Sequence, residues 1–390
     1  MARLVLKSGM DRRLRAGHPW IYRGEIADLV GQWTAGDAIE VLDAGGHLLG
    51  RGFYNPSTSL ACRMLTRLDE PIDQAFFLRR LGAALDYRRS AGLLSDAYRL
   101  CWSEADGLPG LVVDRYGPVS VVQCLTLGMR RAEAWVTASL ESLFPGGSIY
   151  RLDDPSAARI EGFPAERAWR GDPGPSDFSV AEGACRLTVA IGAGQKTGLY
   201  LDQRENHALV AAHGEGRRML DAFSYAGAFA CHALLRGASS ALLLDSSADA
   251  LAIAQRNLEL NGIRDGALLR EANAFHALRR LEADGERFGL IVLDPPPFTR
   301  RKEAVEAASR GYKEINLRAA RLLEPGGVLA TFSCSHHVSP ALFEAICREA
   351  IGDARRQMRV LATLGQSRDH LVLLAVPETR YLTGLLLQAV

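Results

Sequence analysis

Residues 217–245, RRMLDAFSYAGAFACHALLRGASSALLLD, contain the pattern that decides the predicted fold. Residues 219–223 form a short apolar run typical of a buried strand, and residues 228–235, rich in Ala and Leu, predict a helix. A turn that contains Gly227 separates them, and a second apolar strand follows the helix and ends at Asp245. The stretch therefore predicts a βαβ unit in which an acidic side chain closes the second strand.

This unit favours a ligand that contains a nucleoside. In a doubly wound sheet, Asp245 would lie at the carboxyl end of its strand, where its carboxylate can accept hydrogen bonds from both hydroxyl groups of a ribose. A pyrophosphate binder needs the pattern G-x-G-x-x-G, and only Gly227 is present here. Because S-adenosylmethionine carries no phosphate, we expect it to be the cofactor. A dinucleotide, or a βαβ unit without a ligand, is the alternative.

Length and composition predict a cytoplasmic protein of two or three domains. The chain has 390 residues, of which 48% are hydrophobic and 23% are charged. No apolar run approaches the roughly 18 residues of a membrane span, and residues 1–7 lack the apolar segment of a signal peptide. We therefore expect no contact with a membrane.

The cysteines predict free thiols. All seven lie singly along the chain, without a C-x-x-C pair. This spacing indicates neither a disulfide framework nor a zinc cluster, so we expect no metal site.

Charge is balanced overall but unevenly distributed. The chain has 46 basic and 45 acidic residues, for a net charge of +1. Residues 1–23 contain six basic side chains and one acidic one, and residues 300–321 contain seven basic side chains and three acidic ones. Two local basic surfaces suit the binding of a polyanion, and solvated helix and loop faces are the alternative.

The first 70 residues predict a small β-rich domain. Short alternating apolar stretches are interrupted by Gly, Asp and Pro, and residues 43–46 predict a hairpin turn. Trp20 and Tyr22 follow the arginines of the first basic run, so aromatic rings could stack on bases beside groups that bind phosphates. Alternatively, Trp20 covers one end of a small barrel.

Residues 71–180 predict an α+β domain. Residues 75–91 and 132–143 have helical spacing, whereas residues 145–183 are rich in Gly, Pro, Asp and Arg and predict a connection with one strand at 148–152. Residues 191–198 superficially match a phosphate-binding loop. That motif needs Gly at the positions of Gln195 and Ala190, so we expect no phosphate site there.

The last part of the chain, residues 181–390, predicts further strands of a Rossmann-like sheet at 267–270, 288–293 and 327–332. The second of these ends in Asp294, three prolines and Phe298, and the prolines would make a stiff rim against which a flat ring could rest. The third is followed by Cys334. Two carboxyl ends thus present an acid and a thiol to one crevice.

An acid and a thiol are what C5 methylation of a pyrimidine requires. A thiolate adds to C6, an acid supports N3, and the resulting enamine takes the methyl group at C5. Loss of the C5 proton then expels the cysteine. Cys334 is the predicted nucleophile and Asp294 the predicted partner of N3. The alternative is that Cys334 is a buried small hydrophobic residue.

The chain resembles a known enzyme family over essentially its whole length. The segments LRAGHPWIYRGEI, RLCWSEADGLPGLVVDRYG, KTGLYLDQR, LDAFSYAGAFA, VLDPPPF, GGVLATFSCS and DHLVLL occur in this order. Together they are similar to the PUA-domain-containing cytosine-C5 methyltransferases of bacterial 23S rRNA. The resemblance implies an α/β class I methyltransferase fold, with an N-terminal PUA domain and a mostly parallel sheet whose last strand is reversed. Residues 369–376 would supply that strand.

The resemblance also completes the predicted site. It places Gln203 and Arg204 over the cofactor pocket, and it places Asn273 where the family usually has an Asp that accepts from the adenine amino group. The predicted catalytic residues are Cys334 and Asp294. The predicted cofactor-binding residues are Asp221, Phe223, Ser224, Tyr225, Gly227, Asp245, Ser246, Asn273, Asp294, Gln203 and Arg204.

Two positions depart from the related enzymes. Pro297 stands where many RNA cytosine-C5 methyltransferases have a second cysteine that releases the product, and Leu371 stands where the family usually has Pro. The base that removes the C5 proton is therefore unassigned, although His336 and His337 are close to Cys334 in sequence.

Two other functions compete with this prediction. One is methylation of a guanine ring nitrogen such as N7, which needs no thiol, and the other is a non-catalytic role as an RNA-binding assembly factor. The expected partner is 23S rRNA, naked or in a subunit. The oligomeric state is open, with a homodimer as one option.

Overall fold

The chain divides into two units, each built from segments that are distant in sequence. The computed structural model describes residues 2–93, 95–192, 197–299 and 301–390. One unit takes in the chain up to Phe178, with Val189–Leu201 and Arg368–Thr379. The other consists of Ser179–Thr188, Asp202–Ser367 and Arg380–Val390.

The first unit begins with a six-stranded sheet in the order β2-β6-β5-β4-β1-β3. The predicted hairpin joins β4 (Ala38–Leu42) to β5 (Leu48–Tyr54), and the Asp43 carboxylate accepts the backbone N–H groups of Gly45 and His47 at 2.9 Å each. The β-rich character is confirmed. The other elements are β1 (Arg3–Leu6), α1 (Arg12–Arg15), β2 (Trp20–Tyr22), β3 (Ile26–Val30) and β6 (Leu60–Thr66).

A second sheet of the same unit has the order β11-β10-β9-β8-β7, and the predicted helices are confirmed as α2 and α4. Residues 145–183 contain more structure than predicted, because a helix and two further strands follow the one expected strand. Their polar residues enter buried ion pairs: Arg151 is fully buried and lies 3.1 Å from Glu133 and 3.0 Å from Glu166. The elements are α2 (Gln74–Ser90), β7 (Ala97–Trp102), β8 (Leu111–Tyr116), β9 (Val119–Cys124), α4 (Glu133–Leu143), β10 (Ser148–Leu152), α5 (Pro155–Glu161) and β11 (Arg167–Arg170). The next strand, β12 (Asp177–Glu182), belongs to the other unit from Ser179 onward.

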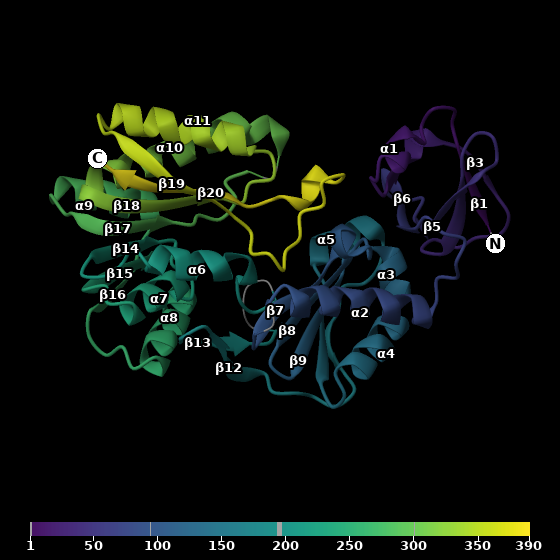
Figure 1. Cartoon of the computed structure of the whole chain (residues 1–390), viewed down its shortest axis with the longest axis horizontal. Helices are drawn as coiled ribbons and strands as arrows, with labels where there is room; N and C mark the ends of the chain where they lie inside the picture. Colours follow the sequence, from purple (N-terminus) through teal and green to yellow (C-terminus); the bar gives the residue numbers. More distant parts are fainter. Residues whose placement is uncertain (1, 94, 193–196, 300) are drawn as a thin grey trace. The chain divides into compact units, whose positions relative to one another are not determined.

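The other unit contains a seven-stranded sheet in the order β16-β15-β14-β17-β18-β20-β19 (Figure 1). The five strands predicted from apolar runs are confirmed as β14 to β18, which pair in parallel. Their bounds and those of the last two strands are β14 (Arg218–Ala222), β15 (Ser240–Asp245), β16 (Ala267–Glu271), β17 (Phe288–Leu293), β18 (Leu323–Ser333), β19 (Met358–Gly365) and β20 (Thr383–Ala389). This is the mostly parallel α/β sheet that the sequence predicted.

The sheet has a reversed strand, but residues 369–376 do not supply it. The reversed strand is β20, which runs antiparallel to both β18 and β19. Residues 369–376 belong to the first unit, where the backbone N–H of Arg99 donates to the buried carboxylate of Asp369 at 2.9 Å. That buried contact fixes the segment beside β7 and corrects the prediction.

Helices cover both faces of the seven-stranded sheet (Figure 1). Neighbouring residues of a strand point to opposite faces, so Met219 packs in one core cluster and Leu220 in the other. Among the helices described, none has the length and apolar character needed to cross a membrane. One face packs against α6 (Arg204–Ala211), α7 (Ala228–Leu235) and α8 (Ala248–Leu260), and the other against α9 (Ala274–Ala283), α10 (Val305–Leu322) and α11 (Pro340–Asp353).

The close packing of β20 on β18 gives a stability prediction. A Cβ atom at Gly384 would lie 2.6 Å from Cδ1 of Phe332 and 2.9 Å from the carbonyl oxygen of Thr331. We expect Gly384→Ala to destabilise this unit by about 1–3 kcal/mol, because overpacking displaces neighbouring atoms. Urea unfolding followed by circular dichroism will show a lower midpoint.

Gly365→Ala is the matched control. Gly365 lies on the neighbouring strand β19, and its added Cβ would meet only the carbonyl oxygen of Leu382, at 3.7 Å. Its midpoint should stay close to that of the wild type. Equal midpoints for the two variants would contradict the packing argument.

Candidate functional site

The turn after β14 is strained and is bound to the end of β15. Phe223 and Tyr225 have positive φ angles of 65° and 46°, a conformation that costs free energy for residues other than Gly. The backbone N–H of Ser224 donates to the carbonyl oxygen of Leu244, and that of Tyr225 donates to Oδ2 of Asp245, both at 2.9 Å. The end of β15 thus holds the turn in a fixed shape.

Asp245 has the geometry predicted for a ribose-binding acid. Its side chain is half-buried at the carboxyl end of β15, next to the exposed Ser246. Oδ1 accepts the backbone N–H of Ser247 at 2.9 Å, while Oδ2 accepts that of Tyr225. Each carboxylate oxygen can accept a second hydrogen bond, so two hydroxyl groups of a ribose fit this group chemically.

Gly227 is required by close packing at the start of α7. Its φ is 71°, and a Cβ atom there would lie 2.9 Å from Cδ2 of Leu243 and 3.0 Å from Cβ of Ala254. The single glycine therefore lets α7 approach β15 and α8. The turn has no glycine-rich cradle for a pyrophosphate, which agrees with a nucleoside ligand that carries no phosphate.

Asp221 lies beneath the turn. It is 1% exposed, and its Oδ2 accepts the backbone N–H of Ala230 at 3.2 Å. Burial raises the pKa of Asp221 to about 8, and the carboxylates of Asp294 and Asp245 add to the rise. The carboxyl group is therefore largely protonated at neutral pH, and its hydrogen bond to Ala230 joins β14 to α7.

Asn273 forms the N-cap of α9. Its Oδ1 accepts the backbone N–H groups of Phe275 and His276, at 3.0 and 3.3 Å. A hydrogen bond from an adenine amino group would have to share this oxygen. The side-chain amide N–H groups of the exposed Asn273 are better placed to meet a ligand.

Gln203 and Arg204 lie at the start of α6, near the same edge of the sheet. Oε1 of Gln203 accepts from Nδ2 of Asn206 at 2.6 Å, and Asn206 donates to the carbonyl oxygen of Gly365 at 2.8 Å. Gly365 ends β19 and pairs with Thr383, which pairs with Ser333, the residue before Cys334. The amide nitrogen of Gln203 is buried and has no hydrogen-bond partner among the described residues, so it could donate to a ligand.

The structure brings Cys334 close to the loop that Asp294 opens. The Sγ atom of Cys334 lies 3.7 Å from the carbonyl oxygen of Pro295, and Cys334 is half-buried just past the end of β18. Asp294 is half-buried after β17, the neighbouring parallel strand, and its backbone N–H lies 3.5 Å from the carbonyl oxygen of Ala222 in β14. The acid, the thiol and the turn after β14 thus share one edge.

Aromatic rings support this loop, and the sequence analysis identified only one of them. The ring of Phe298 lies 4.5 Å from that of Tyr312 and 5.5 Å from that of Phe275, centroid to centroid. The hydroxyl of Tyr312 hydrogen-bonds to Ser335 at 2.8 Å. Tyr312 and Phe275 come from helices α10 and α9, and no spacing along the chain marks them as partners of Phe298. His336 and His337 are exposed beyond Cys334.

The predicted basic surfaces are smaller than the sequence indicated. Arg13 pairs with Glu25 at 2.9 Å, and Arg15 pairs with Asp43 at 3.0 Å. Trp20 is half-buried, and its Nε1 donates to Glu104 at 2.8 Å. In the second run, Arg300 and the side chain of Lys302 lie outside the described residues, as do residues 193–196 of the loop-like segment. The basic residues of α10 form ion pairs, namely Arg310 with Glu306, Lys313 with Asp353, Arg318 with Glu282 and Arg321 with Glu282.

Two family models match the chain. Residues 4–67 match a PUA-like domain, and residues 164–355 match an S-adenosylmethionine-dependent methyltransferase. Among curated proteins, the chain is 38% identical over 387 residues to the ribosomal RNA large subunit methyltransferase I of Erwinia tasmaniensis, covering 98% of each protein. The protein of the same name from Klebsiella pneumoniae is 39% identical over 390 residues, with 98% of this chain and 97% of that protein covered.

Solved structures share the whole fold. A protein from Streptococcus mutans described as a SAM-dependent methyltransferase matches with a TM-score of 0.84 and 17% identity, over all of both chains. Another structure, described as a methyltransferase complexed with SAH, matches with a TM-score of 0.85 and 18% identity over the same coverage. At these low sequence identities, the similarity shows a shared fold and does not show a shared function.

The buried carboxyl group of Asp221 predicts a pH-dependent stability. With a pKa of about 8 in the folded state and of about 3.9 when unfolded, the folded chain keeps a proton that the unfolded chain loses. The stabilising contribution is therefore full below about pH 4 and is lost as the pH rises toward 8. Relative to Asp221→Asn, we expect the wild type to lose up to about 1.4 kcal/mol per pH unit between pH 5 and pH 8.

Urea unfolding of both proteins across this pH range measures the difference. Parallel stability profiles for the wild type and Asp221→Asn would show that the carboxyl group is ionised in the folded state.

Proposed function

Because the chain belongs to the ribosomal RNA large subunit methyltransferase I family and is an S-adenosylmethionine-dependent methyltransferase, we propose that it methylates C5 of a cytosine in 23S rRNA. The observation that carries the choice of C5 is the half-buried thiol of Cys334, 3.7 Å from the carbonyl oxygen of Pro295 in the Asp294 loop. A ring nitrogen would need no such thiol.

The bound cofactor supplies the methyl group on its sulfonium centre, and we assign the residues of the strand edge to hold it. Asp245 would accept the ribose hydroxyl groups, and the turn that contains Phe223, Ser224, Tyr225 and Gly227 would line the nucleoside. Asp221 would support that turn from below. The remaining proposed contacts are Ser246, Asn273, Asp294, Gln203 and Arg204.

The thiolate of Cys334 would add to C6 of the cytosine and form a carbon–sulfur bond. Asp294 would interact with N3 of the ring and stabilise the enamine that this addition forms. C5 of the enamine would then take the methyl group. A base then removes the proton from C5, and the carbon–sulfur bond breaks to release Cys334. Phe298, fixed by Tyr312 and Phe275, would provide an apolar surface beside the ring of the base.

Recognition of the RNA is assigned to the N-terminal PUA-like segment and to the exposed arginines. Arg12 in α1 and Arg301 after the Asp294 loop are exposed and could contact phosphates. The related proteins are named as methyltransferases of large-subunit ribosomal RNA. Such a substrate would place the enzyme in the cytoplasm. We also propose that the chain forms three domains, with boundaries near residues 70 and 180.

The assignment of Asp245 predicts a loss of cofactor affinity. Asp245→Ala removes the acceptors of the ribose hydroxyl groups, so we expect S-adenosylmethionine to bind more weakly by about 1–3 kcal/mol in titration calorimetry. Asp249→Ala, which removes an exposed carboxylate at the start of α8, is the matched control and should bind normally. Equal affinities for the two variants would refute the assignment.

The assignment of Cys334 predicts a complete loss of turnover. With the purified chain, S-adenosylmethionine and 23S rRNA, naked or in a subunit, nucleoside mass spectrometry should detect 5-methylcytidine for the wild type and none for Cys334→Ala. RNA with 5-fluorocytosine at the target cannot lose its C5 substituent, so it should trap a covalent adduct through Cys334.

Cys347→Ala is the control for this experiment. Burial raises the pKa of Cys347 to about 12, so its thiol is not a nucleophile, and the variant should keep both activity and adduct formation. Full activity of Cys334→Ala, or 7-methylguanosine in place of 5-methylcytidine, would exclude the cytosine mechanism. No methyl transfer by the wild type to any rRNA would exclude rRNA as the substrate.

A further inference from the structure

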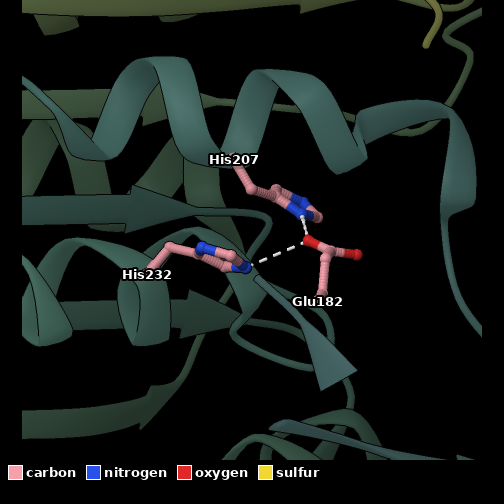
Figure 2. A group of neighbouring side chains, drawn as sticks. All are labelled: Glu182, His207 and His232. Carbon is pink, nitrogen blue, oxygen red and sulfur yellow. Dashed lines mark hydrogen bonds and ion pairs between the residues drawn. The ribbon is translucent and has the colours of Figure 1, made fainter. Parts of the chain in front are cut away.

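Three buried polar side chains lie close together within the unit that contains the seven-stranded sheet. Figure 2 shows Glu182, the last residue of β12, approached by His207 of α6 and His232 of α7. Oε1 of Glu182 lies 2.6 Å from Nδ1 of His207 and 3.0 Å from Nε2 of His232. One potential ligand atom from each side chain lies within 4.8 Å of the others.

Two thiols adjoin this cluster. Cys185, which begins β13 (Cys185–Ala190), lies beside Cys231 and His232. The cluster itself offers one carboxylate and two imidazoles.

The hydrogen-bonding capacity of the His232 side chain is not fully used in this arrangement. Its side chain is buried, with 8% of the residue exposed. Although Nε2 lies 3.0 Å from the Glu182 carboxylate, it makes no hydrogen bond of regular geometry with any described residue. Buried polar atoms of this kind are uncommon in folded proteins and often mark the position of a bound ion or water.

We propose that Glu182, His207 and His232 bind a zinc ion. Zinc is four-coordinate and accepts imidazole nitrogen and carboxylate oxygen as ligands, and a water molecule can fill the position that three such protein ligands leave. With bonds of about 2.0–2.3 Å, the ligand atoms of such a site are roughly 3.3–3.7 Å apart. The separations of 2.6 and 3.0 Å would have to grow by less than about 1 Å, which small rotations of the side chains can provide.

Such a site would be structural. Its ligands come from the β12–β13 hairpin, from α6 and from α7, so one ion would join three segments that are separate in the sequence. The strand edge and its methyl-transfer chemistry do not require it, and the inference stands independently of the proposed substrate.

Metal binding by the full chain tests the inference. The protein is stripped with a chelator, kept reduced so that Cys185 and Cys231 stay as thiols, and titrated with Zn²⁺ against a chromophoric chelator. We expect one equivalent of zinc after desalting, measured by elemental mass spectrometry, and a higher thermal midpoint with zinc than without it. Glu182→Gln, which keeps the shape of the side chain, and His232→Ala should lower the affinity at least tenfold.

His213→Ala is the matched control, because His213 lies just beyond α6 and is half-buried outside the cluster. It should bind zinc as the wild type does.

Two results would overturn the site itself: no stoichiometric zinc in the wild type, or undiminished affinity in both Glu182→Gln and His232→Ala. In that case the cluster is a proton-linked network of buried side chains.

Discussion

The predicted site depends on the carboxylate of Asp245, which holds a strained turn at the end of a parallel strand. Phe223 and Tyr225 both have positive φ angles, and strain of this kind costs on the order of 1–3 kcal/mol per residue. Asp245 offsets part of that cost, because one of its oxygens accepts the N–H of Tyr225 and the other fixes Ser247 at the start of α8. The same group can do this only because β14 and β15 are adjacent and parallel, so that their carboxyl ends meet.

Burial explains why the sheet could be predicted from the sequence and why its reversed strand could not. Strands covered on both faces appear as continuous apolar runs, which is why β14, β15, β17 and β18 were found. The edge strand β16 was found from its short apolar segment, although its Leu268 is 56% exposed. The chain has two further apolar runs near its end, at residues 371–376 and in β20. The composition of the two runs does not show which one forms the reversed strand, but their burial does. Leu374 is 97% exposed, whereas Leu386 in β20 is 1% exposed. The buried contact of Asp369 with Arg99, far away in sequence, decides the position of the first run.

The candidate site was predictable to the extent that its residues end strands. Asp245, Asp294 and Cys334 each follow an apolar run, so strand topology alone brings them to one edge. The use of each polar group was not predictable, because it depends on partners elsewhere in the chain. Asn273 caps α9 with the oxygen that was expected to meet adenine, and Arg13 is paired with Glu25. The basic residues of α10 pair with acids of α9, α10 and α11, so the local excess of basic residues in the sequence is offset by acidic partners.

The Glu182 cluster escaped the sequence analysis for the same reason, since its residues lie on three elements with no motif spacing. Its position relates it to the strand edge. His207 lies one helical turn after Gln203 and Arg204, and His232 lies just over one turn after Gly227. The two helices that carry cofactor-binding candidates at their starts are therefore joined to each other, and to the β12–β13 hairpin, about one turn further along. A strained turn keeps its geometry only when its surroundings are rigid, and a link between α6 and α7 at this depth supplies that rigidity without occupying the site.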